Sequence, residues 1–319
     1  MASRSSRYFT KLGYIRSVAE RTKPRRWGRF VLIAAVGGIT GNALTVHGQA
    51  SLAHDVPAGA STVAAPVPTR RPPSPPAPPT LACPTDMARI GKLCIDRYEA
   101  HLVIVVDGKE SRHPYSSRPP RRAHYEARSA KGVKPQGYIS RLEAERACNN
   151  AGKRLCTLDE WQSACRGSRD TDYPYGNEEE TERCNVGKGH LMSKLFGEAP
   201  DGWTQARFND AKLNEEPGYL AKTGAYETCV TPEGLHDMVG NLHEWVDAEV
   251  TMDLMRKLRS EGVRRHGGPW RRGNSVFMGG FFSTTNEHGK GCQFITIAHE
   301  ARYHDYSTGF RCCAAAQAR

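Results

Sequence analysis

Ten cysteines, all of them after residue 82, constrain the folding of this 319-residue chain more than any other feature. Their number is even and no Cys-x-x-Cys pair occurs, so structural disulfides are favoured over a metal-binding cluster. Disulfides persist in oxidising compartments, and we therefore expect an exported protein, either periplasmic, as in a bacterium, or extracellular. The cysteines stand at positions 83, 94, 148, 156, 165, 184, 229, 292, 312 and 313.

The first 50 residues have the composition of an export signal. Nine Lys or Arg residues and a single acid, Glu20, lie within residues 1–30 and supply about eight of the formal net charge of +11. An apolar run follows over residues 30–46, and then a small-residue stretch, Gly48-Gln-Ala50, that suits cleavage. As a helix the run would reach about 25 Å, marginally enough for an uncleaved anchor that tethers the protein to a membrane. Signal peptide and anchor both stay open, while basicity confined to this segment argues against nucleic-acid binding.

Residues 51–81 are rich in Pro, Ala, Ser and Thr and include the block PPSPPAPP at residues 72–79. Such a composition cannot build a hydrophobic core, so we expect a disordered, extended spacer. No second linker interrupts the rest of the chain. The sequence therefore predicts one folded domain over residues 82–319.

Short strands are predicted near the start of this domain. Residues 93–96 and 102–106 are rich in β-branched side chains, and Asp107-Gly108 is typical of a tight turn. Residues 111–135 are interpreted as an irregular basic loop.

Two helices are predicted from their capping boxes. Ser140 and Thr157 each stand three residues before a Glu, and the helices should end near Gly152 and Gly167. Residues 167–234 contain few further signals of helices or strands and are interpreted as mostly loop. A loop-rich chain of this length again argues for stabilisation by bridges or ions.

Six blocks in a fixed order carry a resemblance to a known family. They are CIDRYE (94–99), GKRLCTLDEWQSACRG (152–167), YPYGN (173–177), GLHDMVGNLHEW (234–245), GG (279–280) and GFRC (309–312). Together they resemble the formylglycine-generating enzyme, or sulfatase-modifying factor, domain over residues 83–313. The resemblance implies an α+β fold, a loop-rich variant of the C-type lectin fold stapled by disulfides.

The resemblance also implies part of the disulfide pairing. In the family a cysteine of the first helix bridges to the Gly-Phe-Arg-Cys block, and one at the end of the second helix bridges to the tail. The corresponding pairs here are Cys148–Cys312 and Cys165–Cys292. For the other six cysteines, proximity and exclusion suggest pairs that stay open: Cys83–Cys94, Cys184–Cys229 and Cys156–Cys313.

A structural calcium ion is implied where the family's Val-Gly-Asn-x-x-Glu-Trp block turns. By position, Asp237 and Glu244 would supply carboxylate oxygens, while Gly240 and Leu242 would supply backbone carbonyl oxygens. A mixed oxygen set of this kind suits a hard cation.

The alternative interpretation of the same block is structural. Asn241 would shape a turn, Glu244 would pair with an arginine, and Trp245 would belong to the core.

The family's copper chemistry is not expected in this chain. The aerobic enzyme oxidises a substrate cysteine to formylglycine with copper(I) held by two thiolates, which lie five residues apart in the tail. Counted from Gly279-Gly280, these positions are Thr284 and Gly289 here, and neither residue can be a thiolate ligand. The nearest cysteine, Cys292, is assigned to a disulfide.

Three histidines of the tail, His288, His299 and His304, leave a different metal site open. The segment 299–304 has a superficial likeness to a zinc-protease motif. Its two histidines are five residues apart, however, about 140° around a helix, whereas the motif needs both on one face. Metal-dependent hydrolysis is therefore not expected.

Two function classes follow from these observations. The first is a non-catalytic, exported member of the family whose lectin-like surface binds a protein, peptide or glycan ligand, with the spacer presenting the domain. The second is an oxidoreductase that modifies a protein or peptide substrate through a non-cysteine metal site, for which no catalytic residue can be named. The missing thiolates favour the first class. The sequence defines neither the ligand nor the oligomeric state.

Overall fold

The computed structural model describes residues 81–260, 272–284 and 288–318. The predicted export segment, residues 1–50, and all but the last residue of the predicted spacer lie outside these ranges. Within the ranges that the structure describes, no helix is long and apolar enough to cross a membrane.

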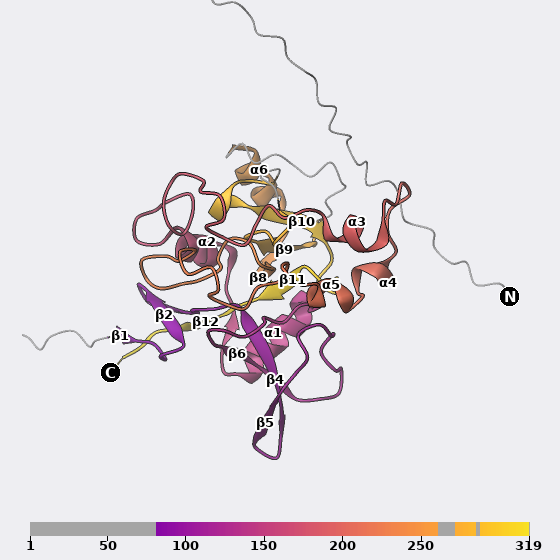
Figure 1. Ribbon diagram of the computed structural model, residues 1–319. Coiled ribbons are helices and arrows are strands. Elements are labelled where there is room, and N and C mark those ends of the chain that lie inside the picture. The colour runs from indigo at the N-terminus through magenta and orange to yellow at the C-terminus, as the bar shows by residue number, and fades with distance from the viewer. Residues whose placement is uncertain (1–80, 261–271, 285–287, 319) are drawn as a thin grey trace, which may run out of the picture. The chain divides into compact units, whose positions relative to one another are not determined.

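The described strands form four small sheets (Figure 1). The central sheet has the order β10-β9-β8-β11 and consists of β8 (His243–Glu249), β9 (Ser275–Met278), β10 (Ile295–His299) and β11 (Thr308–Phe310). A second sheet, β2-β3-β12-β7, consists of β2 (Met87–Ile90), β3 (Leu93–Asp96), β7 (Arg154–Leu155) and β12 (Cys312–Ala315). The others are β5-β4-β6, from β4 (Ala100–Val106), β5 (Lys109–Arg112) and β6 (Tyr125–Ser129), and the pair of β1 (Leu81–Ala82) with β13 (Gln317–Ala318).

Both predicted helices are present, and each begins with a complete capping box. Ser140 precedes α1 (Arg141–Asn150) and Thr157 precedes α2 (Leu158–Arg166). In both, the hydroxyl accepts the N–H of the Glu three residues on, and that Glu carboxylate accepts the N–H of the capping residue. The caps satisfy backbone groups that a helix start leaves unpaired, which is why so short a sequence signal places these helices correctly.

The central sheet is covered by a different helix on each face. Along β8, Trp245 packs in the cluster that contains the α1 residues, and Val246 packs in the cluster that contains the α2 residues. The neighbouring strand β9 repeats this alternation with Phe277 and Val276. Because side chains alternate across a strand, β8 and β9 are buried on both faces, and this sheet forms the centre of the core.

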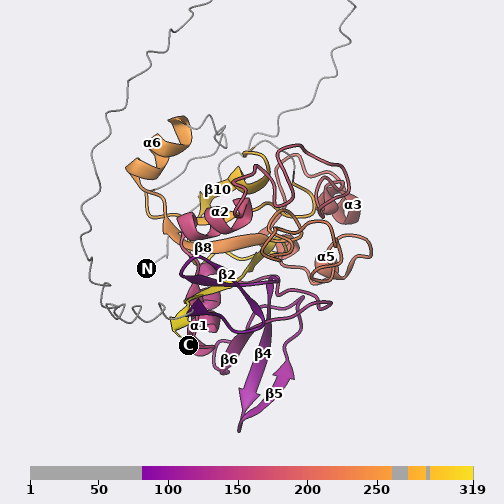
Figure 2. The same ribbon diagram turned by 90° about the vertical axis from the view of Figure 1, so that its left-hand side faces the viewer.

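The β4–β5 hairpin projects away from the rest of the described residues in both views (Figures 1 and 2). Its turn is the predicted Asp107-Gly108, with φ values of 50° and 73°. The interpretation of residues 111–135 as an irregular loop is wrong at Ser111 and Arg112, which end β5, and for β6, which pairs antiparallel with β4. Its signal is an alternation in which Tyr125, Ala127 and Ser129 are buried, and the surrounding arginines obscure it.

The remaining described helices are short. They are α3 (Leu191–Phe196), α4 (Gln205–Phe208), α5 (Lys212–Glu215), α6 (Met252–Ser260) and the 3-10 turn η1 (Gly291–Gln293). A third apolar cluster, which includes Leu191 and Leu213, lies under α3 and α5. The stretch between α2 and β8 is therefore mostly loop, as the sequence indicates.

All ten cysteines are paired in five disulfides. Adjacent residues of β12 reach back to the helical region, with Cys312 bonded to α1 and Cys313 to the residue before Thr157. These are the pairs that the sequence suggested: Cys83–Cys94, Cys148–Cys312, Cys156–Cys313, Cys165–Cys292 and Cys184–Cys229.

Candidate functional site

Arg311 lies at the point where the tail leaves the central sheet and enters the second sheet, between β11 and β12. The residue as a whole is 1% exposed. Nε and Nη2 donate to the two carboxylate oxygens of Glu244 at 2.7 and 2.6 Å, and the other donors reach the carbonyl oxygens of Asp96 and His236. Two parallel bonds of this kind fix both the position and the charge of a buried guanidinium.

Gly309 allows this arrangement because β11 lies close to the turn before β8. A Cβ at Gly309 would be 2.8 Å from Leu242 Cδ1, a distance that real side chains do not adopt. Trp161 of α2 completes the site by donating Nε1–H to Glu244 at 2.6 Å. The Gly-Phe-Arg block thus joins a central strand, α2 and the second sheet through one ion pair.

Two more carboxylates are buried beside this pair. Glu99 accepts bonds from the Asn241 side chain and from the Leu242 N–H, and Asp237 accepts the Gly224 N–H. Burial raises the pKa of Glu99 well above its usual value, and the Asp237 and Glu244 charges raise it further. Burial also raises the pKa of Asp237, to about 6. We call Arg311, Glu244, Glu99 and Asp237 the Arg311 cluster.

Glu244, one of the four residues expected to bind calcium, is already paired on both of its oxygens in this arrangement. Both oxygens of Glu244 are held by Arg311, and one also accepts from Trp161, so calcium would have to displace a buried guanidinium. Each feature of the alternative interpretation is present instead. Asn241 has a φ of 61° at a turn, and Trp245 is 1% exposed.

The two tail positions that replace the copper cysteines are built into the backbone. Thr284 folds back on its own turn, where its Oγ1 accepts the Phe281 N–H at 2.7 Å. Gly289 has a φ of 105°, and a Cβ there would lie 2.6 Å from the Gln293 carbonyl oxygen. A cysteine at Gly289 would therefore be strained and would clash with the backbone. Substituting cysteine for Gly289 alone would not restore a thiolate ligand, because the backbone would also have to change.

Thr284 and Gly289 nevertheless line a cavity of about 260 Å³, which we call the tail cavity. Val239 and Phe294, 6% and 4% exposed, contribute apolar surface, together with Val186 and the bridged Cys184. The lining residues are Tyr173, Tyr175, Glu179, Glu180, Cys184, Val186, Gly187, Val239, Gly279, Thr284, Gly289, Gly291 and Phe294. Segments from four distant parts of the chain thus meet at one hollow.

One side of the tail cavity is aromatic and acidic. Tyr173 and Tyr175 stack with ring centroids 5.4 Å apart, and Glu179 and Glu180 follow them in the chain. Burial raises the pKa of Tyr173, and the Glu179 charge raises it further. The sequence motif YPYGN was recognised only as part of the family pattern, and its place beside the tail positions could not be inferred without the fold.

The three tail histidines lie in separate surroundings. The His288 ring meets the Phe294 ring edge-on, and the His299 ring stacks on the Tyr303 ring with centroids 3.8 Å apart. His304 Nδ1 lies 2.6 Å from Asn209 Oδ1, and burial lowers its pKa. Among residues 81–260, 272–284 and 288–318, no three or more His, Cys, Asp or Glu side chains are grouped so that they could hold a metal ion.

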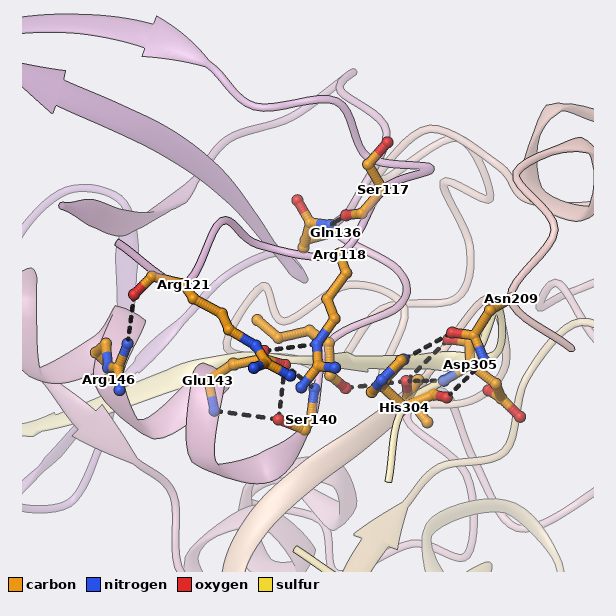
Figure 3. A network of polar contacts seen from close by, with 12 residues as sticks. Ser117, Arg118, Arg121, Gln136, Ser140, Glu143, Arg146, Asn209, His304 and Asp305 are labelled. Carbon is orange, nitrogen blue, oxygen red and sulfur yellow. Dashed lines mark hydrogen bonds and ion pairs between the residues drawn. The ribbon is translucent and has the colours of Figure 1, made fainter. Parts of the chain in front are cut away.

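His304 belongs to a polar network at the start of α1 (Figure 3). Arg118 of the basic loop pairs with Glu143 at 2.7 Å, and Glu143 also closes the capping box with Ser140. The Arg118 charge further lowers the pKa of His304. This network ties the loop to α1, and it accounts for His304 structurally.

The described geometry can be compared with known proteins. A model of the family described as the sulfatase-modifying factor enzyme 1-like domain matches residues 90–316. No curated protein matches the chain.

Solved structures with similar folds include three that are distant in sequence. PvdO from Pseudomonas aeruginosa is 14% identical, with a TM-score of 0.39 over 70% of this chain and 80% of that chain. CarF is 14% identical, with a TM-score of 0.38 over 70% and 86%. The Major Tropism Determinant I1 variant is 13% identical, with a TM-score of 0.40 over 76% of this chain and 55% of that chain. The family match, the described helices and strands and the five disulfides confirm the predicted disulfide-stapled α+β fold of this family.

Proposed function

The chain belongs to the family of sulfatase-modifying factor enzyme 1-like domains, and we propose that within this family it is an exported binding module that lacks copper-dependent cysteine oxidation. The observation that carries the proposal is the backbone at Gly289, which leaves no room for a Cβ. The disulfides support it, because none of the ten cysteines is left as a thiol. Copper(I) held by two thiolates has no ligands here.

The tail cavity supports a binding role. Its volume of about 260 Å³ lies just below the range of about 300–1,000 Å³ that is typical for pockets of small-molecule ligands. A site of this size suits one anchoring side chain of a larger partner better than a whole cofactor. We therefore propose a protein or peptide partner in preference to a glycan.

Export is the second part of the proposal. Five disulfides favour an oxidising compartment, periplasmic or extracellular, and the basic and apolar segments within residues 1–46 would direct the chain there. The Pro-rich residues 51–81 would then hold the domain away from the membrane or the cleavage site. Cell fractionation with an antibody against the domain tests this, and a cytosolic, reduced protein would contradict it.

The loss of oxidation is tested on the purified full chain. The protein is loaded with copper(I), supplied with oxygen and a library of cysteine peptides, and assayed for oxygen uptake and for formylglycine by mass spectrometry. We expect both signals to equal those of a blank without protein. Turnover above the blank would establish the competing oxidoreductase interpretation, and metal analysis of the same sample would identify its ion.

Binding is tested with arrays of peptides in which one position at a time is varied. We expect the full chain to select a residue at one anchor position, and the variant Thr284→Trp, which fills the tail cavity, to lose this selection. Thr284→Val is the matched control, because it removes the Oγ1 bond to the Phe281 N–H without filling the cavity. The same selection in wild type and Thr284→Trp would reject the tail cavity as the binding site.

A further inference from the structure

The acidic side of the tail cavity contrasts with the charge of the whole chain. Residues 170–182 contain six acids and no Lys, Arg or His, although the chain carries a formal charge of +11. Of the six, Glu179 and Glu180 line the tail cavity. The acids are Asp170, Asp172, Glu178, Glu179, Glu180 and Glu182. Three of the six form ion pairs within the chain, Asp170 with Arg166, Asp172 with Lys290 and Glu180 with Arg183. The remaining excess of negative charge attracts a cationic ligand and repels an anionic one.

The inner surface of the tail cavity is apolar. Val239 and Phe294 are almost fully buried, and Val186 and the Cys184–Cys229 bridge add aliphatic and sulfur surface. The glycines of the lining add no side chains. A ligand that reaches this surface therefore gains from methylene groups, at about 25 cal/mol for each Å² of apolar surface removed from water.

A cavity with an apolar interior and carboxylates at its opening suits a side chain that is apolar along its length and cationic at its end. Lysine and arginine bury their methylene stems along apolar surface and keep the charged end near water or a carboxylate. The chain holds one such cation beside the cavity already. The Arg183 guanidinium lies 4.6 Å from the Tyr175 ring centroid and 2.7 Å from a Glu180 oxygen. Aromatic and acidic groups on this side are thus arranged to receive a cation.

We propose that the tail cavity binds the side chain of a lysine or arginine presented by a peptide or protein partner, with its stem against Val239 and Phe294 and its cationic end beside Glu179 and Glu180. This inference rests on the proposed binding function and names the chemistry of its ligand. Where the family's enzyme would hold a substrate cysteine next to copper, this chain would hold a basic residue and leave it unmodified.

The test uses saturation-transfer NMR with the full chain and four small probes. The probes are the Nα-acetyl N-methylamides of lysine, arginine, norleucine and glutamate. We expect both basic probes to bind at least about fivefold more tightly than norleucine, with saturation of their methylene protons, and glutamate to show none. The tighter of the two basic probes identifies the side chain.

Charge variants of the acidic segment locate the binding. Glu179→Gln/Glu180→Gln removes two charges that line the cavity, and Glu178→Gln/Glu182→Gln removes two that do not. We expect the first variant to weaken binding of the basic probes at least fivefold and the second to change it less than twofold. Thermal unfolding of each variant checks that the fold is retained.

Equal weakening in both variants would overturn the assignment to the tail cavity. Norleucine binding as tightly as lysine, without loss in the Glu179 and Glu180 variant, would overturn the basic ligand and leave the proposed binding function intact. No saturation of either basic probe would also overturn this inference. The peptide arrays then decide the binding function separately, because they do not presuppose a basic anchor.

Discussion

The C-terminal tail contributes residues to two polar regions that differ in how far their charges are buried. In the Arg311 cluster, a guanidinium inside the domain meets the Glu244 carboxylate, and every group is buried. At the tail cavity, Glu179 and Glu180 are exposed at an opening with an apolar interior. The tail thus supplies the buried cation of the first region and part of the lining of the second, whose exposed carboxylates come from residues 179 and 180. Mutation of the Arg311 cluster should therefore lower the stability of the domain, whereas mutation at the tail cavity should weaken ligand binding and change stability little.

Substitution of the buried guanidinium should have the largest effect. We expect Arg311→Met to lower the free energy of unfolding by about 3–5 kcal/mol, because it leaves Glu244 buried and uncompensated. The measurement is urea unfolding followed by circular dichroism. Arg183→Met is the contrast, since its ion pair with Glu180 is partly exposed and is worth at most about 1 kcal/mol.

The double variant Arg311→Met/Glu244→Gln sharpens the same comparison. It removes both charges, so it should recover part of the stability lost in the single variant. If Arg311→Met cost no more than Arg183→Met, the Arg311 cluster would not be the internal stabiliser described above.

The loss of stability on removing a disulfide should not simply follow the sequence separation of its two cysteines. Cys184–Cys229 closes a 45-residue loop beside the tail cavity, and its removal should cost about 3 kcal/mol, up to about 4 from chain entropy. Cys148–Cys312 spans 164 residues, but Cys156–Cys313 already joins the same two segments, so it closes a loop of only about ten residues. Its removal should cost about 1 kcal/mol less.

Paired Cys→Ala variants and urea unfolding measure this difference. Removal of both parallel bridges together should cost more than the sum of the single losses, since each bridge keeps the other's loop short and, without both, only Cys165–Cys292 joins these parts of the chain. Simple additivity would show that the two bridges act independently.

Acid should weaken the domain through His101 of β4, outside both tail regions. Burial, helped by the charges of Arg112 and Arg128 and partly offset by Glu110, lowers the pKa of His101 to about 4. Between about pH 6.5 and pH 4, His101 is therefore protonated in the unfolded chain, where its pKa is near 6.5, and neutral in the folded chain. Stability is then complete above pH 6.5 and falls as the pH drops toward 4, by about 2 kcal/mol at pH 5.

His101→Phe should remove most of this loss, because the ring stays buried and cannot be protonated. Unfolding at pH 7 and pH 5 for both proteins gives the comparison. An unchanged pH dependence in the variant would assign the acid sensitivity to other groups.

Calcium removal should have the smallest effect. Since Arg311 occupies both oxygens of Glu244, a calcium chelator should shift the melting temperature by less than about 2 °C, which is under about 1 kcal/mol for a domain of this size. Magnesium addition is the control for ionic strength. A large rise in melting temperature with calcium alone would show that the cation displaces the guanidinium and that the site implied by the family forms.

Local chemistry explains which features could be predicted from the sequence. The capping boxes at Ser140 and Thr157 act within four residues, so the helices could be located without tertiary information. Strand β6 was missed because its apolar alternation is short and lies in an arginine-rich stretch. The family pattern located the tail positions Thr284 and Gly289, but the strained backbone at Gly289 appears only in three dimensions.

The tail cavity itself could not be predicted. Its walls come from residues 173–187, Val239, Gly279 and the segment from Thr284 to Phe294, which only the completed fold brings together. The sequence contained the acidic run and the tyrosines without any sign that they face Thr284. Glu99 likewise lies in the CIDRYE block, and only the fold shows that it is buried in the Arg311 cluster.

The pairing of β1 with β13 has a practical consequence. Leu81 lies opposite Ala318 and Ala82 opposite Gln317, so the two ends of the described domain are neighbours, about one strand spacing of 4.8 Å apart. A domain with adjacent ends tolerates circular permutation and insertion into a host loop. Joining residue 318 to residue 81 and opening the chain at Asp107-Gly108 would give a permuted protein with the tail, its bridges and its cavity placed mid-chain.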